Sequence, residues 1–163
     1  MHSGYRIGFG YDVHQLSQDR KLILGGILIP SEKGSVAHSD GDVLIHAICD
    51  ALLGAACLGD IGTHFPDNSS EYKDIDSKLL LERVLKLIAK EGYRIINIDS
   101  TISLQKPKLK EYIPSMQDTL ASLLDIETNS ISIKATTTEH LGFVGREEGI
   151  AAQTVVLIEK SSD

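Results

Sequence analysis

The sequence has few cysteines and no long apolar run, and both absences limit what the protein can be. Its two cysteines, Cys49 and Cys57, lie eight positions apart in one predicted helix. That spacing corresponds to about 12 Å along the helix axis, which exceeds disulfide reach. We therefore expect two small buried hydrophobic side chains in a reducing compartment. No apolar run approaches the roughly 20 residues that a membrane-spanning helix needs, so we expect no membrane partner.

Positive charge is also in deficit, since the formal net charge is −7 at pH 7. A protein that tracks a nucleic-acid backbone needs a basic face, so we expect no nucleic-acid partner. A small phosphorylated substrate is compatible with this charge, because a cation and a few local Lys or Arg side chains suffice. The segment Met1–Tyr5 is not typical of a signal peptide. We expect a cytoplasmic protein, or one of a plastid-type organelle if a transit peptide has been removed.

Several common catalytic and cofactor motifs are missing as well. The sequence contains neither a Walker-type phosphate loop nor a Gly-x-Ser-x-Gly element. Gly8 and Gly10 do not form a dinucleotide fingerprint, because the third glycine and the following helix are absent.

The length of 163 residues suits one domain, and we expect a single catalytic domain over residues 1–163. Hydrophobic patterning predicts strands at Arg6–Val13, Tyr93–Leu104, Ser130–Thr136 and Ile150–Glu159. It predicts helices from Asp42 to Cys57, at Asp76–Glu91, and at Lys108–Asp125 with an early interruption by Pro114. The remaining segments are an extended stretch with a Gly-Gly turn and two polar loops: Lys21–Pro30, Ser31–Gly41 and Gly59–Lys73. We expect an α+β fold, with a four-stranded mixed sheet covered by helices on one face, plus a small hairpin.

The pair Asp12 and His14, separated by an apolar residue, is the strongest chemical signal. Alternate residues of a strand point to the same side, so both side chains share one space. With His46 from the first helix, they form a carboxylate and two imidazoles, which suit Zn²⁺ or a similar ion with an open fourth position. The alternative is a solvated polar stripe, because Asp42, His46 and Asp50 are spaced four apart on that helix. In the metal interpretation, Asp42 or Asp50 could orient the imidazole of His46.

Three further segments could carry chemistry, each with an ordinary alternative. His38 and Ser39 precede the first helix, where they suit either an anionic oxygen or simple cap chemistry. Asp60 and Asp67 lie on the long loop, where carboxylates could hold polyol hydroxyls or a hard cation. Glu139 follows three threonines at a predicted strand end and could bind Mg²⁺ or Mn²⁺.

Taken together, these segments resemble the 2-C-methyl-D-erythritol 2,4-cyclodiphosphate synthase family from Arg6 to Ile158. The resemblance rests on ordered motifs: Asp12-Val13-His14, Ala37 to Asp42 with His46, Leu58 to Gly62, Phe65-Pro66-Asp67, Gln105 to Lys108, and Lys134 to Arg146. It implies a lyase of the non-mevalonate isoprenoid pathway. That enzyme converts 4-diphosphocytidyl-2-C-methyl-D-erythritol 2-phosphate to the 2,4-cyclodiphosphate and CMP, by attack of the 2-phosphate on the β-phosphate.

The resemblance also implies how the site is used. Zn²⁺ would be held by Asp12, His14 and His46, and Mg²⁺ or Mn²⁺ by Glu139, while His38 and Thr137 would act on the phosphates. One group of residues would bind the methylerythritol part of the substrate: Ser39, Asp60, Ile61, Gly62, Phe65 and Asp67. A second group would bind its cytidine part: Leu104, Lys108, Leu109, Lys110, Ala135, Thr136 and Thr138. The family is a homotrimer with active sites between subunits. Phe143, Arg146 and Glu148 would surround a central channel that could take an isoprenoid diphosphate.

The sequence departs from the commonest family pattern at Phe9, Ser69 and Glu147. Two other functions are compatible with the same residues. A metal-dependent phosphohydrolase would need a general base, which Asp60 or Asp67 could supply. A non-catalytic trimer with a structural metal would need a fourth protein ligand, such as His38 or His64.

Overall fold

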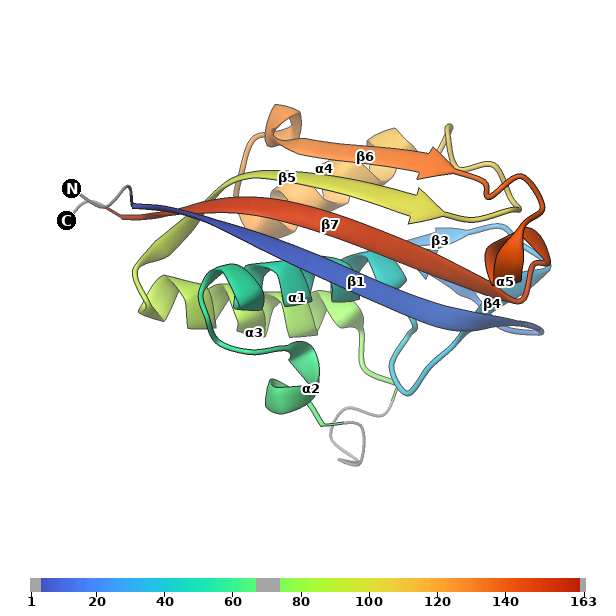
Figure 1. Ribbon diagram of the computed structural model, residues 1–163, viewed down its shortest axis with the longest axis horizontal. Helices are drawn as coiled ribbons and strands as arrows, with labels where there is room; N and C mark the ends of the chain where they lie inside the picture. The colour runs from blue at the N-terminus through green and yellow to red at the C-terminus, as the bar shows by residue number, and fades with distance from the viewer. Residues whose placement is uncertain (1–3, 67–73, 162–163) are drawn as a thin grey trace.

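The computed structural model describes residues 4–66 and 74–161, and its centre is a five-stranded mixed sheet (Figure 1). In the order in which they pair, the strands are β4 (Lys33–Val36), β1 (Tyr5–Gln18), β7 (Gly149–Lys160), β5 (Tyr93–Ser103) and β6 (Ile131–Thr136). Neighbouring strands run antiparallel except β5 and β6, which are parallel. The predicted α+β fold with a mixed sheet is confirmed.

The prediction of four strands is wrong by one, because it placed β4 inside a polar loop. This short strand pairs with the far end of β1, with Leu16 opposite Ser35. Its Lys-Gly-Ser-Val sequence has no apolar alternation, and glycine is depleted in strands. Its position at the sheet edge is therefore visible only once β1 extends to Gln18, five residues beyond the predicted end at Val13.

Three helices pack on one side of the sheet, as predicted: α1 (Val43–Ala55), α3 (Ser77–Lys90) and α4 (Ile113–Leu124) (Figure 1). The last one begins later than the predicted Lys108, because Pro114 occupies the first helical turn, where its missing N–H costs nothing. Three short helices complete the described chain: α2 (Ile61–His64), η2 (Thr128–Ser130) and α5 (Gly142–Gly145). Among these described residues, no helix is both long and apolar enough to cross a membrane.

The predicted small hairpin is confirmed as β2 (Leu22–Leu24) and β3 (Ile27–Ile29), which form their own two-stranded sheet. Gly25 and Gly26 make its turn with φ of 58° and 78°, a left-handed conformation that glycine adopts without strain. Both of their N–H groups donate to the carboxylate of Asp42, at 3.1 and 2.7 Å. Because Asp42 also caps α1 through the N–H of Ile45, the hairpin is tied to the start of that helix.

Gly8 and Gly10 allow α1 to lie directly against β1. A Cβ at Gly8 would lie 1.8 Å from the carbonyl oxygen of Ala51, and one at Gly10 would lie 1.9 Å from that of Ala47. Only glycine permits such an approach, so these two residues set the spacing between strand and helix. They share the strand face with Asp12 and His14, which therefore also point toward α1.

The opposite face of β1 is apolar and exposed. Ile7, Phe9, Tyr11 and Val13 occupy its alternate positions and are 74, 62, 46 and 42% exposed. Val155 on the neighbouring strand β7 is 44% exposed. A contiguous apolar patch of this kind is unusual on a monomer and marks an interaction surface.

Candidate functional site

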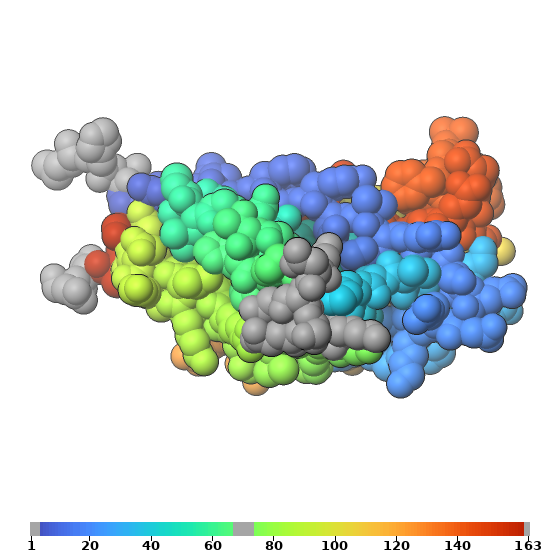
Figure 2. All heavy atoms as spheres, turned by 90° about the horizontal axis from the view of Figure 1, so that it is seen from below, coloured from blue at the N-terminus to red at the C-terminus, as the bar shows by residue number. Residues whose placement is uncertain are grey.

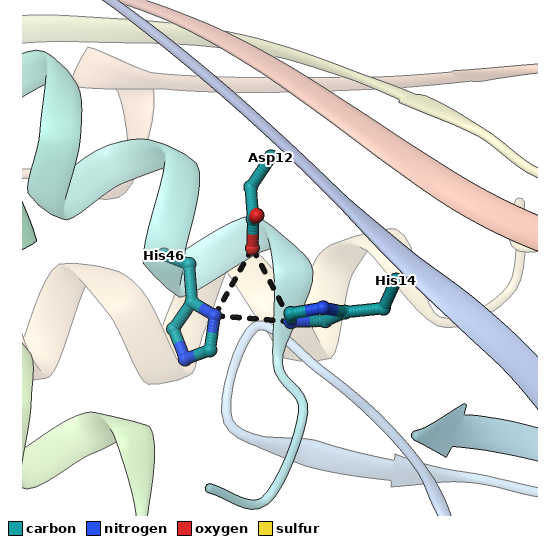
Figure 3. A group of neighbouring side chains, drawn as sticks. All are labelled: Asp12, His14 and His46. Atoms are coloured by element: carbon teal, nitrogen blue, oxygen red, sulfur yellow. Dashed lines mark hydrogen bonds and ion pairs between the residues drawn. The ribbon is translucent and has the colours of Figure 1, made fainter. Parts of the chain in front are cut away.

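Asp12, His14 and His46 converge on one point between β1 and α1 (Figure 3). The Oδ2 atom of Asp12 lies 3.0 Å from Nδ1 of His46 and 3.2 Å from Nε2 of His14. The two imidazole nitrogens are themselves 3.1 Å apart. The structure therefore brings together the three side chains that the sequence singled out as metal ligands.

This spacing is compatible with a cation shared by the three side chains. A tetrahedral Zn²⁺ with bonds of about 2.0 to 2.1 Å holds its ligand atoms about 3.3 Å apart. The observed separations of 3.0 to 3.2 Å come close to that value without rearrangement. One carboxylate and two imidazoles form a ligand set typical of a catalytic divalent cation with an open position.

The ring of His46 is held from its other side by Ser39 and Ser77. Its Nε2 atom lies 2.9 Å from Oγ of Ser77 and 3.2 Å from Oγ of Ser39. Ser77 in turn donates its hydroxyl hydrogen to Oδ1 of Asp40 at 2.5 Å. The imidazole is thus oriented with Nδ1 toward the other two ligands.

The prediction that Asp42 or Asp50 orients His46 is wrong. The carboxylate of Asp42 accepts hydrogen bonds from the N–H groups of the hairpin turn and of α1. The carboxylate of Asp50 accepts the N–H of Ile61 at 2.8 Å. Sequence reasoning missed Ser77 in this role, because it interpreted the residue only as the start of a helix. Asp40 likewise gave no sequence signal beyond its place in a polar turn.

The environment shifts the two imidazoles in opposite directions. Burial lowers the pKa of His14, although the charge of Asp12 opposes this shift. Burial also lowers the pKa of His46, but the hydrogen bond and charge of Asp12, with the charges of Asp42 and Asp40, outweigh it and raise the pKa. A proton and a cation therefore compete for Nδ1 of His46, while His14 is kept in the neutral form that binds metal.

The triad lines a cavity of about 290 Å³. Among the predicted residues, this cavity also includes His38, Ser39, Ile61, Gly62 and Phe65. Three more of the described residues line it without having been predicted as site residues: Ala37, Ile75 and Leu80. Figure 2 shows, on one face of the molecule, the green segment of α1 and α2 and the blue to cyan segment that precedes α1.

Asp60, one of the two carboxylates proposed for the long loop, is not among the described residues that line this cavity. Asp60 is exposed and caps α2, where its Oδ1 accepts the N–H and the hydroxyl of Thr63, both at 2.8 Å. These bonds lower the pKa of Asp60. Asp67 lies outside the described residues. His64, one candidate for a fourth metal ligand, has its Nε2 atom 2.8 Å from the carbonyl oxygen of Leu58 and so is engaged elsewhere.

A second cavity, of about 310 Å³, lies between the end of β6 and the loop that follows β5. It contains most of the predicted cytidine set together with Thr137: Leu104, Lys108, Leu109, Lys110, Ala135 and Thr136. Gln105, Pro107 and Ile113 also line it. Of these, Ile113 was not predicted, because the sequence placed it inside a helix rather than at its start.

The two cavities have no described lining residue in common. Asp12 and His14 lie on β1, whereas Ala135 and Thr136 end β6, and β7 and β5 stand between these strands. Three strand spacings correspond to about 14 Å across the sheet. Within one chain, the predicted metal half and nucleotide half of the site are therefore separate.

Glu139 belongs to the nucleotide side of the molecule. It is exposed, has φ of 51°, and its Oε1 accepts the hydroxyl of Thr137 at 3.3 Å. Thr138 donates its own hydroxyl to the carbonyl oxygen of Leu141 at 2.6 Å, which closes the turn before α5. The described metal-type group consists of the triad and does not include Glu139.

The residues predicted around a channel lie on and after α5. Phe143 is 38% exposed, and its ring is close enough to Gly149 that a Cβ there would lie 2.8 Å from it. The guanidinium of Arg146 donates to Glu148 at 3.1 and 2.9 Å, and this carboxylate raises the pKa of Arg146.

Two of the three departures from the family pattern can be placed. Phe9 lies on the exposed apolar face of β1. Glu147 adopts φ of 57°, the left-handed region that favours glycine, and its carboxylate lies 3.1 Å from Nζ of Lys106. Ser69 lies outside the described residues.

Fold and site together define a class of protein: a small α+β domain with a preformed Asp-His-His group of metal-ligand type beside an open cavity. A model of the YgbB family matches residues 5–159. The chain belongs to this family, and the resemblance inferred from its motifs is confirmed.

Curated relatives carry the name expected from that resemblance. The chain is 63% identical over 155 residues to a 2-C-methyl-D-erythritol 2,4-cyclodiphosphate synthase of Bacteroides fragilis, covering 95% of this chain and 98% of the relative. A synthase of the same name from Syntrophomonas wolfei is 56% identical over 156 residues, covering 96 and 99%.

Solved structures show the same fold. The bifunctional IspDF of Campylobacter jejuni matches with a TM-score of 0.95 and 42% identity over 99% of this chain, which spans only 44% of that structure's chain. The CDP complex of IspF from Plasmodium falciparum matches with a TM-score of 0.86 and 33% identity, covering 99% of this chain and 100% of that one.

Proposed function

We propose that this chain catalyses the cyclisation of 4-diphosphocytidyl-2-C-methyl-D-erythritol 2-phosphate to 2-C-methyl-D-erythritol 2,4-cyclodiphosphate with release of CMP. The observation that carries the proposal is the convergence of Asp12, His14 and His46 within 3.0 to 3.2 Å, in a chain 63% identical to a synthase of that name. In the reaction, an oxygen of the 2-phosphate forms a bond to the β-phosphorus. The bond from that phosphorus to the bridging oxygen breaks, and CMP leaves with the electron pair.

Asp12, His14 and His46 would hold Zn²⁺ or a similar divalent ion. When bound, this ion would neutralise negative charge on the diphosphate of the substrate. Glu139 would hold Mg²⁺ or Mn²⁺. Two such cation sites would explain how a chain with a net charge of −7 can accept a highly anionic substrate.

The protein's own groups bind and orient the substrate, because the nucleophile is already part of that substrate. His38 and Ser39 lie in the cavity of the triad, where they can donate hydrogen bonds to phosphate or polyol oxygens. Lys108, Lys110 and Thr137 line the other cavity and offer ammonium and hydroxyl groups to a nucleotide phosphate. Holding a flexible chain so that its two phosphate ends meet is catalysis by proximity.

The nucleotide half is assigned to cytidine by analogy with the IspF complex that contains CDP. The cavity suits a base and ribose, since Leu104, Leu109 and Ile113 form an apolar wall beside polar backbone and the hydroxyl of Thr136.

A homotrimer would join the two halves of the site. The metal cavity and the nucleotide cavity are separate within one chain, so a neighbouring subunit is needed to bring them together. The exposed apolar face of β1, with Ile7, Phe9 and Val13, provides a surface for that contact. In such a trimer, Phe143 and Arg146 would border a central channel for an isoprenoid diphosphate, although Glu148 already pairs with Arg146.

We further propose that residues 1–163 act as one catalytic domain and that the protein is cytoplasmic. The two curated relatives reported above, from Bacteroides fragilis and Syntrophomonas wolfei, are bacterial and match over nearly their whole length, which supports the cytoplasmic assignment.

Incubation with the cytidine diphosphate substrate tests the proposal directly. We expect the cyclic diphosphate and CMP in equal amounts, identified by ³¹P NMR, and loss of both after treatment with a chelator. A phosphohydrolase using the same triad would instead release a linear bisphosphate of methylerythritol with CMP. That outcome would overturn the cyclase assignment.

The role of Glu139 has its own test. Glu139→Gln should raise the Mg²⁺ concentration needed for half-maximal turnover more than it weakens binding of CDP, because it removes a charged ligand but no cytidine contact. Glu82→Gln, at an exposed position on α3, is the matched control and should leave both unchanged. An identical Mg²⁺ requirement in the Glu139 variant and the unaltered protein would contradict the assignment.

A further inference from the structure

The imidazole of His46 is backed by a buried serine from a different helix. Ser77 begins α3 and is 0% exposed, and its Oγ lies 2.9 Å from Nε2 of His46 on α1. Asp40, in the loop before α1, accepts both the hydroxyl of Ser77 at 2.5 Å and its backbone N–H at 3.0 Å. The start of α3 therefore meets the loop before α1 behind one metal ligand, although the two segments are distant in sequence.

The direction of these hydrogen bonds follows from donor counting. A carboxylate only accepts, so the single hydroxyl hydrogen of Ser77 goes to Asp40. The oxygen of Ser77 can then only accept from His46, which requires the ring proton to be on Nε2. A neutral imidazole with its proton there has its lone pair on Nδ1, the atom that faces Asp12 and His14.

We propose that Ser77, anchored by Asp40, is a positioning residue that sets the divalent-cation affinity of the triad by fixing the tautomer and orientation of His46. This inference rests on the proposed metal site and adds a determinant to it. The half-buried carboxylate of Asp40 polarises the chain of hydrogen bonds and increases electron density on Nδ1.

Ser39 also approaches Nε2 of His46, but it is less suited to this role. Its Oγ is 3.2 Å away rather than 2.9 Å, and it accepts the N–H of Gly41 at 3.3 Å instead of being anchored by a charged group. Ser39 is also half-buried and lines the cavity, where substrate can compete for its hydroxyl. Ser77 has no such exposure.

The test measures cation affinity rather than turnover. Zn²⁺ and Co²⁺ dissociation constants are determined by competition with a chromogenic chelator for the unaltered full chain, Ser77→Ala, Ser77→Thr and Asp40→Asn. Loss of an outer hydrogen bond to a ligating imidazole typically weakens metal binding by about 10- to 100-fold. We expect that loss in Ser77→Ala, a smaller one in Asp40→Asn, substantial recovery in Ser77→Thr, and altered visible absorption of bound Co²⁺ in Ser77→Ala.

Ser100→Ala is a matched control. Ser100 is 1% exposed, and its hydroxyl pairs with that of Thr154 at 2.8 Å within the sheet, away from the triad. It should retain full cation affinity. Affinity in both Ser77→Ala and Asp40→Asn within twofold of the unaltered protein would overturn the inference, as would an equal loss in Ser100→Ala. If the unaltered protein and His46→Ala bind the cations equally, the metal site itself is wrong; this outcome separates the two failures.

Discussion

The metal half and the nucleotide half of the proposed site are built in different ways. The metal half is enclosed: His46 is 6% exposed, and its ring is fixed by contacts from three segments of the chain. The nucleotide half is open, since Lys108, Lys110 and Thr136 are all exposed. Its loop is linked to β6 by the N–H of Leu104, which donates to the carbonyl oxygen of Thr136, and to Glu147 by an exposed ion pair.

The difference follows from what each half has to do. Three ligands must keep their positions within a few tenths of an ångström for a cation to bind tightly, so their supports are buried and specific. A nucleotide can be held by a wall and a few donors, and a second subunit can complete the enclosure. We infer that a single chain forms the complete metal half, whereas the nucleotide half is completed only when subunits assemble.

Removing a ligand should break the metal half completely. His46→Ala is expected to abolish turnover and cation binding at the triad, because two ligands cannot hold a catalytic divalent ion. The fold and the oligomeric state should persist, since the buried apolar residues of α1 still pack against the sheet. CMP release is the measurement, with circular dichroism and sedimentation as folding controls. Unaltered CMP release would refute the assignment of the triad.

A substitution on the exposed sheet face should prevent association of the subunits. It should leave the metal half and the nucleotide half intact within each chain. Phe9→Lys places a charge on the apolar face of β1, so we expect monomers in sedimentation velocity and loss of turnover, with Zn²⁺ affinity preserved. Leu28→Lys is the control, because Leu28 is 61% exposed but lies on the hairpin. A fully active monomer of Phe9→Lys would show that one chain suffices.

A change in the spacing between β1 and α1 should weaken the metal half and leave the nucleotide half unaffected. Gly10→Ala would place a Cβ 1.9 Å from the carbonyl oxygen of Ala47, so α1 has to move. We expect a loss of about 1 to 3 kcal/mol in the free energy of unfolding and weaker Zn²⁺ binding, with CDP affinity little changed.

Gly54→Ala provides the contrast for that experiment, because Gly54 is within α1 and a Cβ built there meets no described atom within 4 Å outside its chain neighbours and its own helix backbone. It should stabilise the protein by about 0.5 to 1 kcal/mol, as removal of a helical glycine usually does. Urea unfolding measures both variants. Equal stability of the two alanine variants would contradict the close approach of α1 to β1.

The smallest effect is expected in the nucleotide half. Glu147→Gln removes the ion pair with Lys106, which is 71% exposed, so the loss should be at most about 1 kcal/mol. CDP affinity measured by calorimetry should fall a few-fold, and the charge swap of Lys106→Glu with Glu147→Lys should restore part of it. Zn²⁺ affinity should not change. An unaffected CDP affinity would show that this pair does not position the loop.

The sequence was most informative where a local pattern was enough. The alternation of Asp12, Val13 and His14 predicts a shared strand face, and the structure places both polar side chains on it. The helix periodicity predicts α3 to within one residue at each end. The prediction of a loop at Ser31–Gly41 missed β4, because this strand forms only through its pairing with β1. A short polar strand has no sequence pattern that predicts its pairing partner.

The sequence by itself determined the ligand types, the order of the elements and the family, because these depend on residue identity and on periodicity along the chain. Only the tertiary structure decided that Ser77 and Asp40 support His46, that Asp42 and Asp50 do not, and that Gly8 and Gly10 admit α1. These contacts join residues far apart in sequence. Their geometry is set by how closely helices pack on a sheet, which no local pattern encodes.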